Sequence, residues 1–127
     1  MSEIKFRAFI DGEMFNVTRI LFAGDVVYVK TASEEHDGHE FQLEPKDLMK
    51  YIGIEDIDRV EIYEGDVVNI VEDERNICGY VSKKDGCFGH FEVDSEYYTP
   101  FFRLVRANSK LKVIGNIHEN PELIGDV

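Results

Sequence analysis

The feature that most constrains this fold is a series of short runs in which apolar and polar residues alternate, separated by turn dipeptides that contain glycine. In residues 4–8, Ile, Phe and Ala alternate with Lys and Arg, which is typical of a half-buried β-strand. Glycine next to aspartate, a common signature of tight turns, occurs at Asp11-Gly12, Gly24-Asp25, Asp37-Gly38, Gly65-Asp66 and Asp85-Gly86. The pattern predicts a mainly β chain.

The runs between these turns predict extended segments over 4–8, 14–18, 26–30, 60–71, 101–105 and 111–117, and a hairpin of 77–82 with 87–93 that turns at Lys84-Asp85-Gly86. Two short helical segments complete the prediction. One begins at Pro45 and ends at Gly53. The other is a helical turn over Asn120–Leu123, with Asn120 as its N-cap and Pro121 in its first position.

One seven-residue pattern occurs twice in the chain. Leu21–Val27 and Ile62–Val68 both place an aliphatic and an aromatic residue before Gly-Asp-Val-Val. The two segments are either similar turn-then-strand units of a small barrel or separate uses of a common turn. In the second segment and the strand that follows, Ile62, Val67 and Ile70 are the expected core residues.

The charge of the chain is unevenly distributed. Its 127 residues, a length that predicts one domain, include 26 Asp and Glu and 14 Lys and Arg, a net charge of −12. Residues 31–66 hold twelve acidic and three basic residues (net −9), whereas 103–112 hold four basic residues and no acidic one. Because phosphate binding needs surplus cations, the total charge disfavours direct binding to nucleic acid or to anionic membranes. We expect the basic run to pair with the acidic segment of the same chain or of a neighbour.

Targeting signals and cysteines predict a cytoplasmic protein. No apolar region follows the charged N-terminus, which argues against a signal peptide. No stretch approaches the roughly 18 apolar residues of a membrane span, so no membrane is expected as a partner. Cys78 and Cys87 are too few for a disulfide framework, and the predicted hairpin places them out of register.

Two clusters are candidates for metal binding or catalysis. His36-Asp37-Gly38-His39 brings two imidazoles and a carboxylate together, and Cys78, Cys87 and His90 offer three further ligands. We interpret the first cluster as a solvated hairpin tip. In the second, strand alternation points residues 87 and 90 to opposite faces, so we expect a part-buried cysteine beside a surface histidine. The sequence therefore predicts no metal, no cofactor and no enzyme.

An aromatic run marks a possible interface. Tyr97, Tyr98, Phe101 and Phe102 surround Pro100. On one strand, adjacent aromatic residues cannot all face inward, so either they divide between core and surface or a partner covers the outer ones. Two cations that follow, Arg103 and Arg106, belong to the same candidate interface.

Three segments resemble the YopX family of phage and prophage proteins. They are the opening Ile4–Ala8, the block from Tyr51-Ile52-Gly53-Ile54 to Glu61–Val68, and the closing Val113–Ile124. The family shows "IKFRA", "YTGL…EIYEGDIV" and "VIGNIYENPEL" in this order. The chain departs from it at Ile52, at His118, and in residues 55–59, where the family often has an Asn-Gly turn.

The resemblance implies a single domain over 1–127, mainly β and built on a small SH3-like barrel or roll, with a variable acidic segment at about 31–60. It also implies a phage or prophage gene expressed in the cytoplasm of a bacterial host cell. Its motif residues have fold-making side chains, so we assign them structural roles: Tyr63, Glu64, Gly65, Asp66, Gly115, Asn116, Glu119, Asn120 and Pro121.

Two functions remain open at this point. The first is a non-enzymatic accessory module that binds another protein or assembles with itself, indicated by the aromatic run and the opposed charge blocks. The alternative is an acidic nucleic-acid mimic that occupies the basic groove of a host DNA-binding protein, because dense carboxylates imitate phosphates. Metal-dependent hydrolysis and direct nucleic-acid binding have weaker indications.

Overall fold

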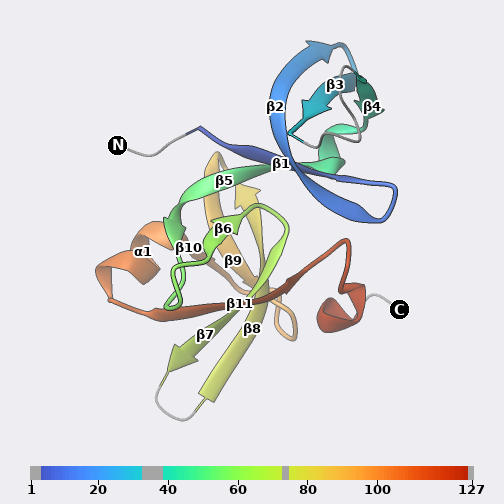
Figure 1. Ribbon diagram of the computed structural model, residues 1–127. Helices are drawn as coiled ribbons and strands as arrows, with labels where there is room; N and C mark the ends of the chain where they lie inside the picture. Colours follow the sequence, from blue (N-terminus) through green and yellow to red (C-terminus); the bar gives the residue numbers. More distant parts are fainter. Residues whose placement is uncertain (1–3, 33–38, 73–74, 126–127) are drawn as a thin grey trace. The chain divides into compact units, whose positions relative to one another are not determined.

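The computed structural model describes residues 4–32, 39–72 and 75–125 (Figure 1). Within them the fold is mainly β, as predicted, with two antiparallel sheets of six and five strands and one short α-helix. The expected small SH3-like barrel or roll is not confirmed, because the ladders of these described residues form open sheets and do not close into a barrel. None of the helices in this part of the chain has the length and apolar character needed to cross a bilayer.

Contacts divide the chain into two compact units, residues 1–51 and 52–127. The single domain expected over 1–127 stays a prediction. In the first unit, the strands follow the order β4-β3-β2-β1-β5. They are β1 (Phe6–Ile10), β2 (Glu13–Ala23), β3 (Val26–Thr31), β4 (Phe41–Leu43) and the first half of β5 (Leu48–Glu55). Their core consists of Ala8, Ile10, Val27, Val29 and Leu48.

The predicted helix over 45–53 is wrong. Only Pro45–Asp47 form a 3₁₀ turn, and Leu48 begins strand β5. Leu48 pairs with Ala8 of β1 and enters the core of the first unit. Proline sets one turn, but the residues after it can hydrogen-bond to β1 and bury apolar surface only when they are extended. Here, tertiary pairing overrides the local helical signal.

The second unit holds a five-stranded sheet in the order β10-β9-β8-β7-β11. Strand β6 follows the second half of β5, and α1 and a 3₁₀ turn complete the unit. The elements are β6 (Glu61–Tyr63), β7 (Asp66–Glu72), β8 (Arg75–Lys84), β9 (Cys87–Glu92), β10 (Tyr98–Pro100), α1 (Phe101–Arg106), β11 (Lys110–Asn116) and the 3₁₀ turn Pro121–Ile124. The predicted core residues Ile62, Val67 and Ile70 are all buried.

The predicted hairpin of 77–82 with 87–93 is confirmed as β8 and β9. Lys84 pairs with Cys87 across the turn. Asp85 and Gly86 both have positive φ, 52° and 82°, which a two-residue hairpin turn of this kind requires. Cys78 pairs with Asn69 of β7, and both cysteines are free. The expectation that the cysteines lie out of register is therefore confirmed.

Three further segments differ from the prediction. Residues 101–105 form helix α1, because this buries Phe101 and Leu104 one helical turn apart. Residues 60–71 form two strands, β6 and β7, separated by a turn at Glu64-Gly65. The predicted turn at 120–123 exists, but as a 3₁₀ turn in which the Asn120 side chain makes no capping hydrogen bond.

Candidate functional site

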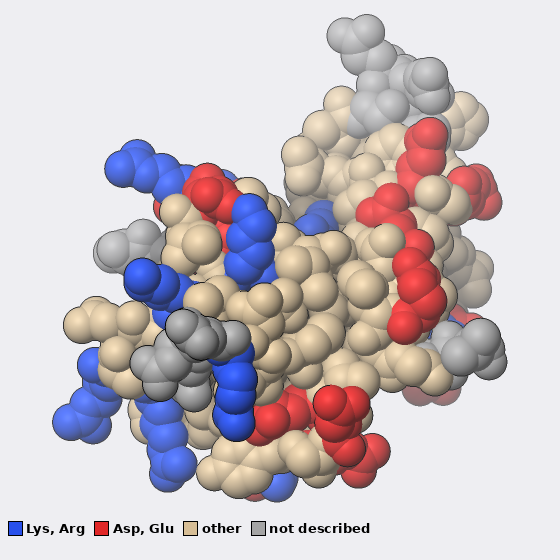
Figure 2. All heavy atoms as spheres, turned by 90° about the horizontal axis from the view of Figure 1, so that it is seen from below, with Lys and Arg blue, Asp and Glu red and all other residues tan. Residues whose placement is uncertain are grey.

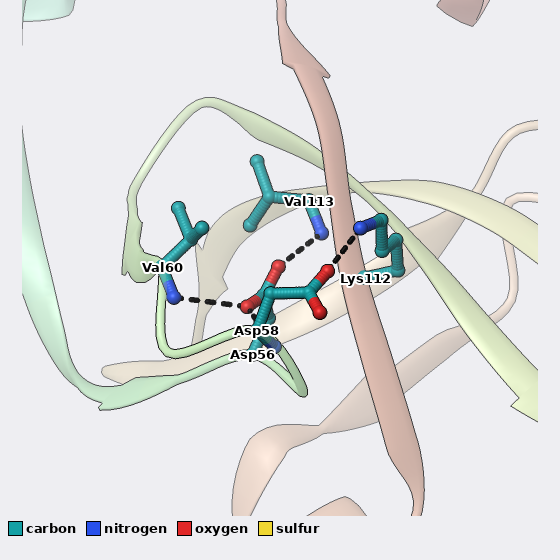
Figure 3. A network of polar contacts seen from close by, with 5 residues as sticks. All are labelled: Asp56, Asp58, Val60, Lys112 and Val113. Carbon is teal, nitrogen blue, oxygen red and sulfur yellow. Dashed lines mark hydrogen bonds and ion pairs between the residues drawn. The ribbon is translucent and has the colours of Figure 1, made fainter.

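A closed loop between β5 and β6 is held by one carboxylate (Figure 3). Asp56 is buried, and its Oδ1 accepts hydrogen bonds from the backbone N–H groups of Asp58 (2.8 Å) and Val60 (2.9 Å). Its Oδ2 accepts one from the N–H of Val113 (2.9 Å) on β11. The Arg59 backbone lies at φ 66°, a left-handed conformation that the loop stabilises. Sequence analysis did not single out Asp56.

These donors also change the acidity of the Asp56 carboxyl. Burial raises the pKa of Asp56. The three backbone N–H donors, helped by the nearby Lys112 ammonium, lower it further than burial raises it, so its pKa lies below the usual value. Asp56 therefore stays ionised and stabilises the loop rather than exchanging protons near neutral pH.

The loop also occupies one edge of the five-stranded sheet. The N–H of Ile57 donates to the carbonyl of Leu111 (2.9 Å), and the N–H of Val113 donates to Asp56. Both groups lie on the side of β11 that faces away from β7. A short loop and a carboxylate thus supply the hydrogen bonds that a further strand would make there.

The expected pairing of the acidic and basic segments is confirmed at one point within this chain. Lys112, in the basic run, forms an ion pair with Asp58 in the acidic segment (Figure 3). Both side chains are about half exposed, so water and salt screen most of the attraction. The pair orients the loop and adds little to stability.

An apolar groove of about 400 Å³ lies beside this loop. It runs between the end of β5, the first residues of the loop, the end of α1 and the start of β11. It is lined by Ile54, Glu55, Asp56, Ile57, Val105, Asn108, Ser109, Lys110 and Leu111. Ile57 and Val105 are 54% and 52% exposed, although both are large aliphatic residues. The groove therefore offers unburied apolar surface.

Helix α1 presents cations next to the groove. Phe101 and Leu104 face the core, which leaves Arg103 and Arg106 exposed. Figure 2 shows Lys and Arg side chains standing out at the left, the side on which Figure 1 shows α1. In the described part of the chain, no ion pair engages Arg103, Arg106 or Lys110.

The structure separates the predicted aromatic run. Phe101 is buried, whereas Tyr97 and Phe102 are exposed. Tyr98 packs against Phe91 in a tilted arrangement, with ring centroids 4.7 Å apart, and its hydroxyl donates to the carbonyl of Cys87 (2.6 Å). The run is therefore not one surface, and its role as an interface stays a prediction. Of the predicted residues that are exposed, Phe102, Arg103 and Arg106 lie on α1, next to the groove residue Val105.

The first four motif residues, Tyr63, Glu64, Gly65 and Asp66, form a largely buried turn. The N–H of Tyr63 donates to Asp66 Oδ2 (2.8 Å), and Glu64 is half-buried between them. Gly65 lies at φ 88°, its N–H donates to the carbonyl of Val81 (2.9 Å), and its carbonyl accepts from the N–H of Ile117 (2.8 Å). This turn connects three separate parts of the second unit.

The closing motif builds a second polar network. Asn116 Oδ1 accepts from the N–H groups of His118 (3.0 Å) and Glu119 (2.9 Å), and its Nδ2 donates to Glu119 Oε1 (2.8 Å). The Asn116 N–H donates to Asn120 Oδ1 (3.2 Å). A Cβ at Gly115 would lie 2.5 Å from that oxygen, and β11 has a bulge at this point. Pro121 begins the 3₁₀ turn.

In the second cluster of potential ligands, Cys87 and His90 differ in exposure as expected, but the histidine is the buried residue and the cysteine the exposed one. His90 is fully buried and Cys87 is exposed, whereas the sequence predicted a surface histidine. The His90 Nε2 lies 2.9 Å from the carbonyl of Val68, and burial lowers the pKa of His90 despite that hydrogen bond. Gly79 makes room for this imidazole, because a Cβ there would collide with the ring.

The first cluster lies mostly outside the described residues, since His36, Asp37 and Gly38 are among those the structure does not describe. Within residues 4–32, 39–72 and 75–125, no three His, Cys, Asp or Glu side chains are arranged to hold a metal ion.

Sequence analysis missed the groove itself. Its walls come from residues 54–57 and 105–111, two segments that share no motif. The available signal was weak: Ile57 interrupts an acidic segment, and Val105 lies between two arginines. Apolar residues in such charged surroundings indicate contact surface only when both segments are known to meet.

Comparison with known proteins bears on the whole chain. The family model described as "YopX protein" matches residues 5–125, and a search of the curated proteins finds no match. The chain is similar to a solved structure, protein EF1440 from Enterococcus faecalis, with 27% sequence identity and a TM-score of 0.61, over 98% of this chain and 99% of that one. Since the family model covers nearly every residue, this chain belongs to the YopX family.

Proposed function

We propose that this chain is a non-enzymatic module that binds another protein through the groove beside α1. The observation that carries the proposal is the pair Ile57 and Val105, two aliphatic side chains of the groove lining that are more than half exposed. Water contact with such surface is unfavourable, and its burial by a partner is a driving force for association.

The environment of the buried ionisable groups supports a non-enzymatic role. Asp56 and Asp66 accept backbone hydrogen bonds with their carboxylates, and His90 lies against the carbonyl of Val68. Catalytic acids and bases must reach a substrate, whereas Asp66 and His90 are enclosed in the second unit and both carboxylate oxygens of Asp56 are occupied by backbone N–H groups.

The proposal extends to the biological setting. Membership of the YopX family supports an accessory protein of a phage or prophage that acts in the cytoplasm of a bacterial host cell. A small SH3-like arrangement of the second unit is part of this proposal. It is supported by the antiparallel meander β7-β8-β9-β10 and by α1, which leads from β10 into β11.

The alternative, a nucleic-acid mimic, has less support. A mimic needs carboxylates that are free to face a basic groove. In the acidic segment, Asp56 and Asp66 are buried and hydrogen-bonded, and Asp58 is paired with Lys112. These three carboxylates are therefore already engaged by groups of the chain itself.

A comparison of matched variants tests the proposal. The purified chain is immobilised, and proteins captured from a bacterial lysate are quantified by mass spectrometry. We expect Ile57→Asp and Val105→Asp to reduce capture of a specific partner by about tenfold, since each places a charge in the apolar contact. Phe22→Asp, a change at an even more exposed apolar residue of the first unit, serves as the control.

The outcome depends on which variants lose the partner. Equal capture by the wild type and both groove variants would show that the groove is not the contact. Equal loss with Phe22→Asp would show a non-specific effect of added negative charge. Thermal unfolding of each variant confirms that the fold is intact.

A further inference from the structure

We infer that the groove takes an acidic segment of its partner, one that inserts an apolar side chain between Ile57 and Val105 and places carboxylates against the cations beside it. The inference rests on the proposed function and names the chemistry of the partner. It is carried by the position of charges around the groove.

The groove is too small for a broad interface. Its volume is about 400 Å³, and its lining includes Leu111, which belongs to the core of the second unit. A space of this size accommodates one or two side chains, as in grooves that anchor short peptides. An aliphatic or aromatic side chain is the natural occupant, because the exposed walls are Ile57 and Val105.

Next to the groove, α1 carries a continuous stripe of exposed aliphatic, aromatic and basic side chains. Residues three or four apart lie side by side on a helix, so Phe102 adjoins both Val105 and Arg106. All three side chains are exposed. The stripe therefore leads from the groove wall over an aromatic ring to a guanidinium.

Lys110 supplies a second cation at the groove itself. It is exposed and forms part of the lining, and Glu55 is the exposed acid of the same lining. With Arg103 and Arg106 on the adjoining helix, there are three exposed cations, against the exposed Glu55 and the buried Asp56, whose carboxylate is already hydrogen-bonded within the chain. The exposed charges in and next to the groove are thus mainly positive, although the whole chain has a net charge of −12.

Among the described residues, Lys112 differs from the other cations of the basic run because it has an acidic partner within the chain. Lys112, also in the basic run, is paired with Asp58. In the described part of the chain, Arg106 and Lys110 have no such internal acid. Cations left without an acid next to apolar surface are complementary to a segment that carries both acidic and apolar side chains.

A protein segment fits this site better than a nucleic acid. Charges further than about 10 Å away are largely screened at physiological salt, so a short acidic peptide interacts mainly with the local cations. A long polyanion would extend beyond them and meet the acidic remainder of the chain. The favoured partner is therefore a short acidic and apolar stretch of a protein.

Selection from a random peptide library on the immobilised full chain tests the inference. We expect the selected peptides to be enriched in Asp and Glu around one Leu, Ile or Phe. The double variant Arg106→Glu/Lys110→Glu should weaken binding of a selected peptide by about tenfold or more. Raising NaCl from about 0.05 M to about 0.5 M should weaken it several-fold.

Two variants separate this inference from the proposed function. Ile57→Asp should abolish peptide binding, and Lys84→Glu, which makes the same kind of charge reversal away from the groove lining, should leave it unchanged. Selected peptides that lack acidic enrichment, or that bind the double variant as well as the wild type, would overturn the acidic partner while leaving a binding groove. Peptides unaffected by Ile57→Asp would overturn both.

Self-association is the remaining alternative. Sedimentation equilibrium of the wild type and Ile57→Asp should show monomers in both. A concentration-dependent oligomer that Ile57→Asp dissociates would overturn the inference, because the occupant of the groove would then be a second copy of the chain.

Discussion

The same tetrapeptide, Gly-Asp-Val-Val, forms two different structures in the two units. In the first unit, Gly24 and Asp25 form an exposed hairpin turn, closed by the pairing of Ala23 with Val26. In the second unit, Gly65 and Asp66 are buried, and Asp66 is only 1% exposed. The glycine has positive φ in both, 63° and 88°, so the local conformation is related and the surroundings differ.

The difference comes from what each turn contacts. The turn in the first unit connects two neighbouring strands, β2 and β3, and ends in solvent. The turn in the second unit connects β6 to β7 and bonds through Gly65 to Val81 and Ile117. A sequence repeat therefore predicts the backbone conformation of a turn. The burial of that turn and its contribution to stability depend on residues far away in the sequence.

The residues that precede the two turns should show the largest difference in their contribution to stability. Leu21 and Phe22 are 56% and 69% exposed, whereas Ile62 is completely buried and Tyr63 nearly so. We expect Ile62→Ala to lower the free energy of unfolding by about 4 kcal/mol, because it leaves a cavity in the core. Leu21→Ala should change it by less than about 0.5 kcal/mol. Urea unfolding followed by circular dichroism measures both, and similar values would contradict the comparison.

The two aspartates of the tetrapeptide should show the second-largest difference in their contribution to stability. Asp66→Ala leaves the buried N–H of Tyr63 without its acceptor, so we expect a loss of about 3 kcal/mol in the free energy of unfolding. Asp25→Ala removes an exposed side chain and should cost less than about 0.5 kcal/mol. The same urea titrations compare the pair. A small effect at Asp66 would show that water or another group replaces the carboxylate.

The two glycines should differ less, because both need positive φ. Gly24→Ala meets no neighbouring atom, so only backbone strain acts, and we expect a loss of about 1 kcal/mol. Gly65→Ala combines strain with burial and should cost about 2 kcal/mol. Equal losses would indicate that strain alone decides both positions. Differential scanning calorimetry resolves such differences as shifts in Tm.

The pH dependence of stability should arise in the second unit, which holds the buried groups His90 and Asp56. The pKa of His90 is lowered by burial from 6.5, so the unfolded chain binds the proton first. Stability should fall as pH drops below about 6.5 and stop falling below the pKa of the folded state. Unfolding free energies measured between pH 7.5 and pH 4.5, as approximate limits, report this window.

The variant His90→Gln provides the control. It should be less stable overall, because a different side chain fills the space beside Gly79, but its stability should vary much less across that window. An unchanged pH profile would assign the dependence to another group. Asp56 acts separately, since its lowered pKa places its loss of stability below about pH 4.

Much of the β-structure was predictable because its signals are local. The hairpin of β8 and β9 follows from alternation and from Asp85-Gly86, whose positive φ values the turn demands. The burial of Ile62, Val67 and Ile70 follows from their apolar character within and next to a strong motif. Such features depend on a few adjacent residues.

The predictions from sequence were wrong where contacts between residues far apart in the chain determine the secondary structure. Residues 48–53 contain a helical signal after Pro45, yet pairing with β1 makes them a strand. Residues 101–106 look extended because they are aromatic and β-branched, yet Phe101 and Leu104 are buried only if the segment is helical. The groove was not predictable, because its walls are about 50 residues apart in the sequence and meet only in the folded unit.

The loop held by Asp56 has a consequence for the behaviour of the chain at high concentration. An open strand edge is a template on which other copies can add strands and grow into aggregates. Here the N–H of Val113 and the carbonyl of Leu111 are already occupied, one by a carboxylate and one by a loop N–H. The loop that Asp56 holds together thus blocks this part of β11 to a further strand, at the position where the family often has a simple Asn-Gly turn.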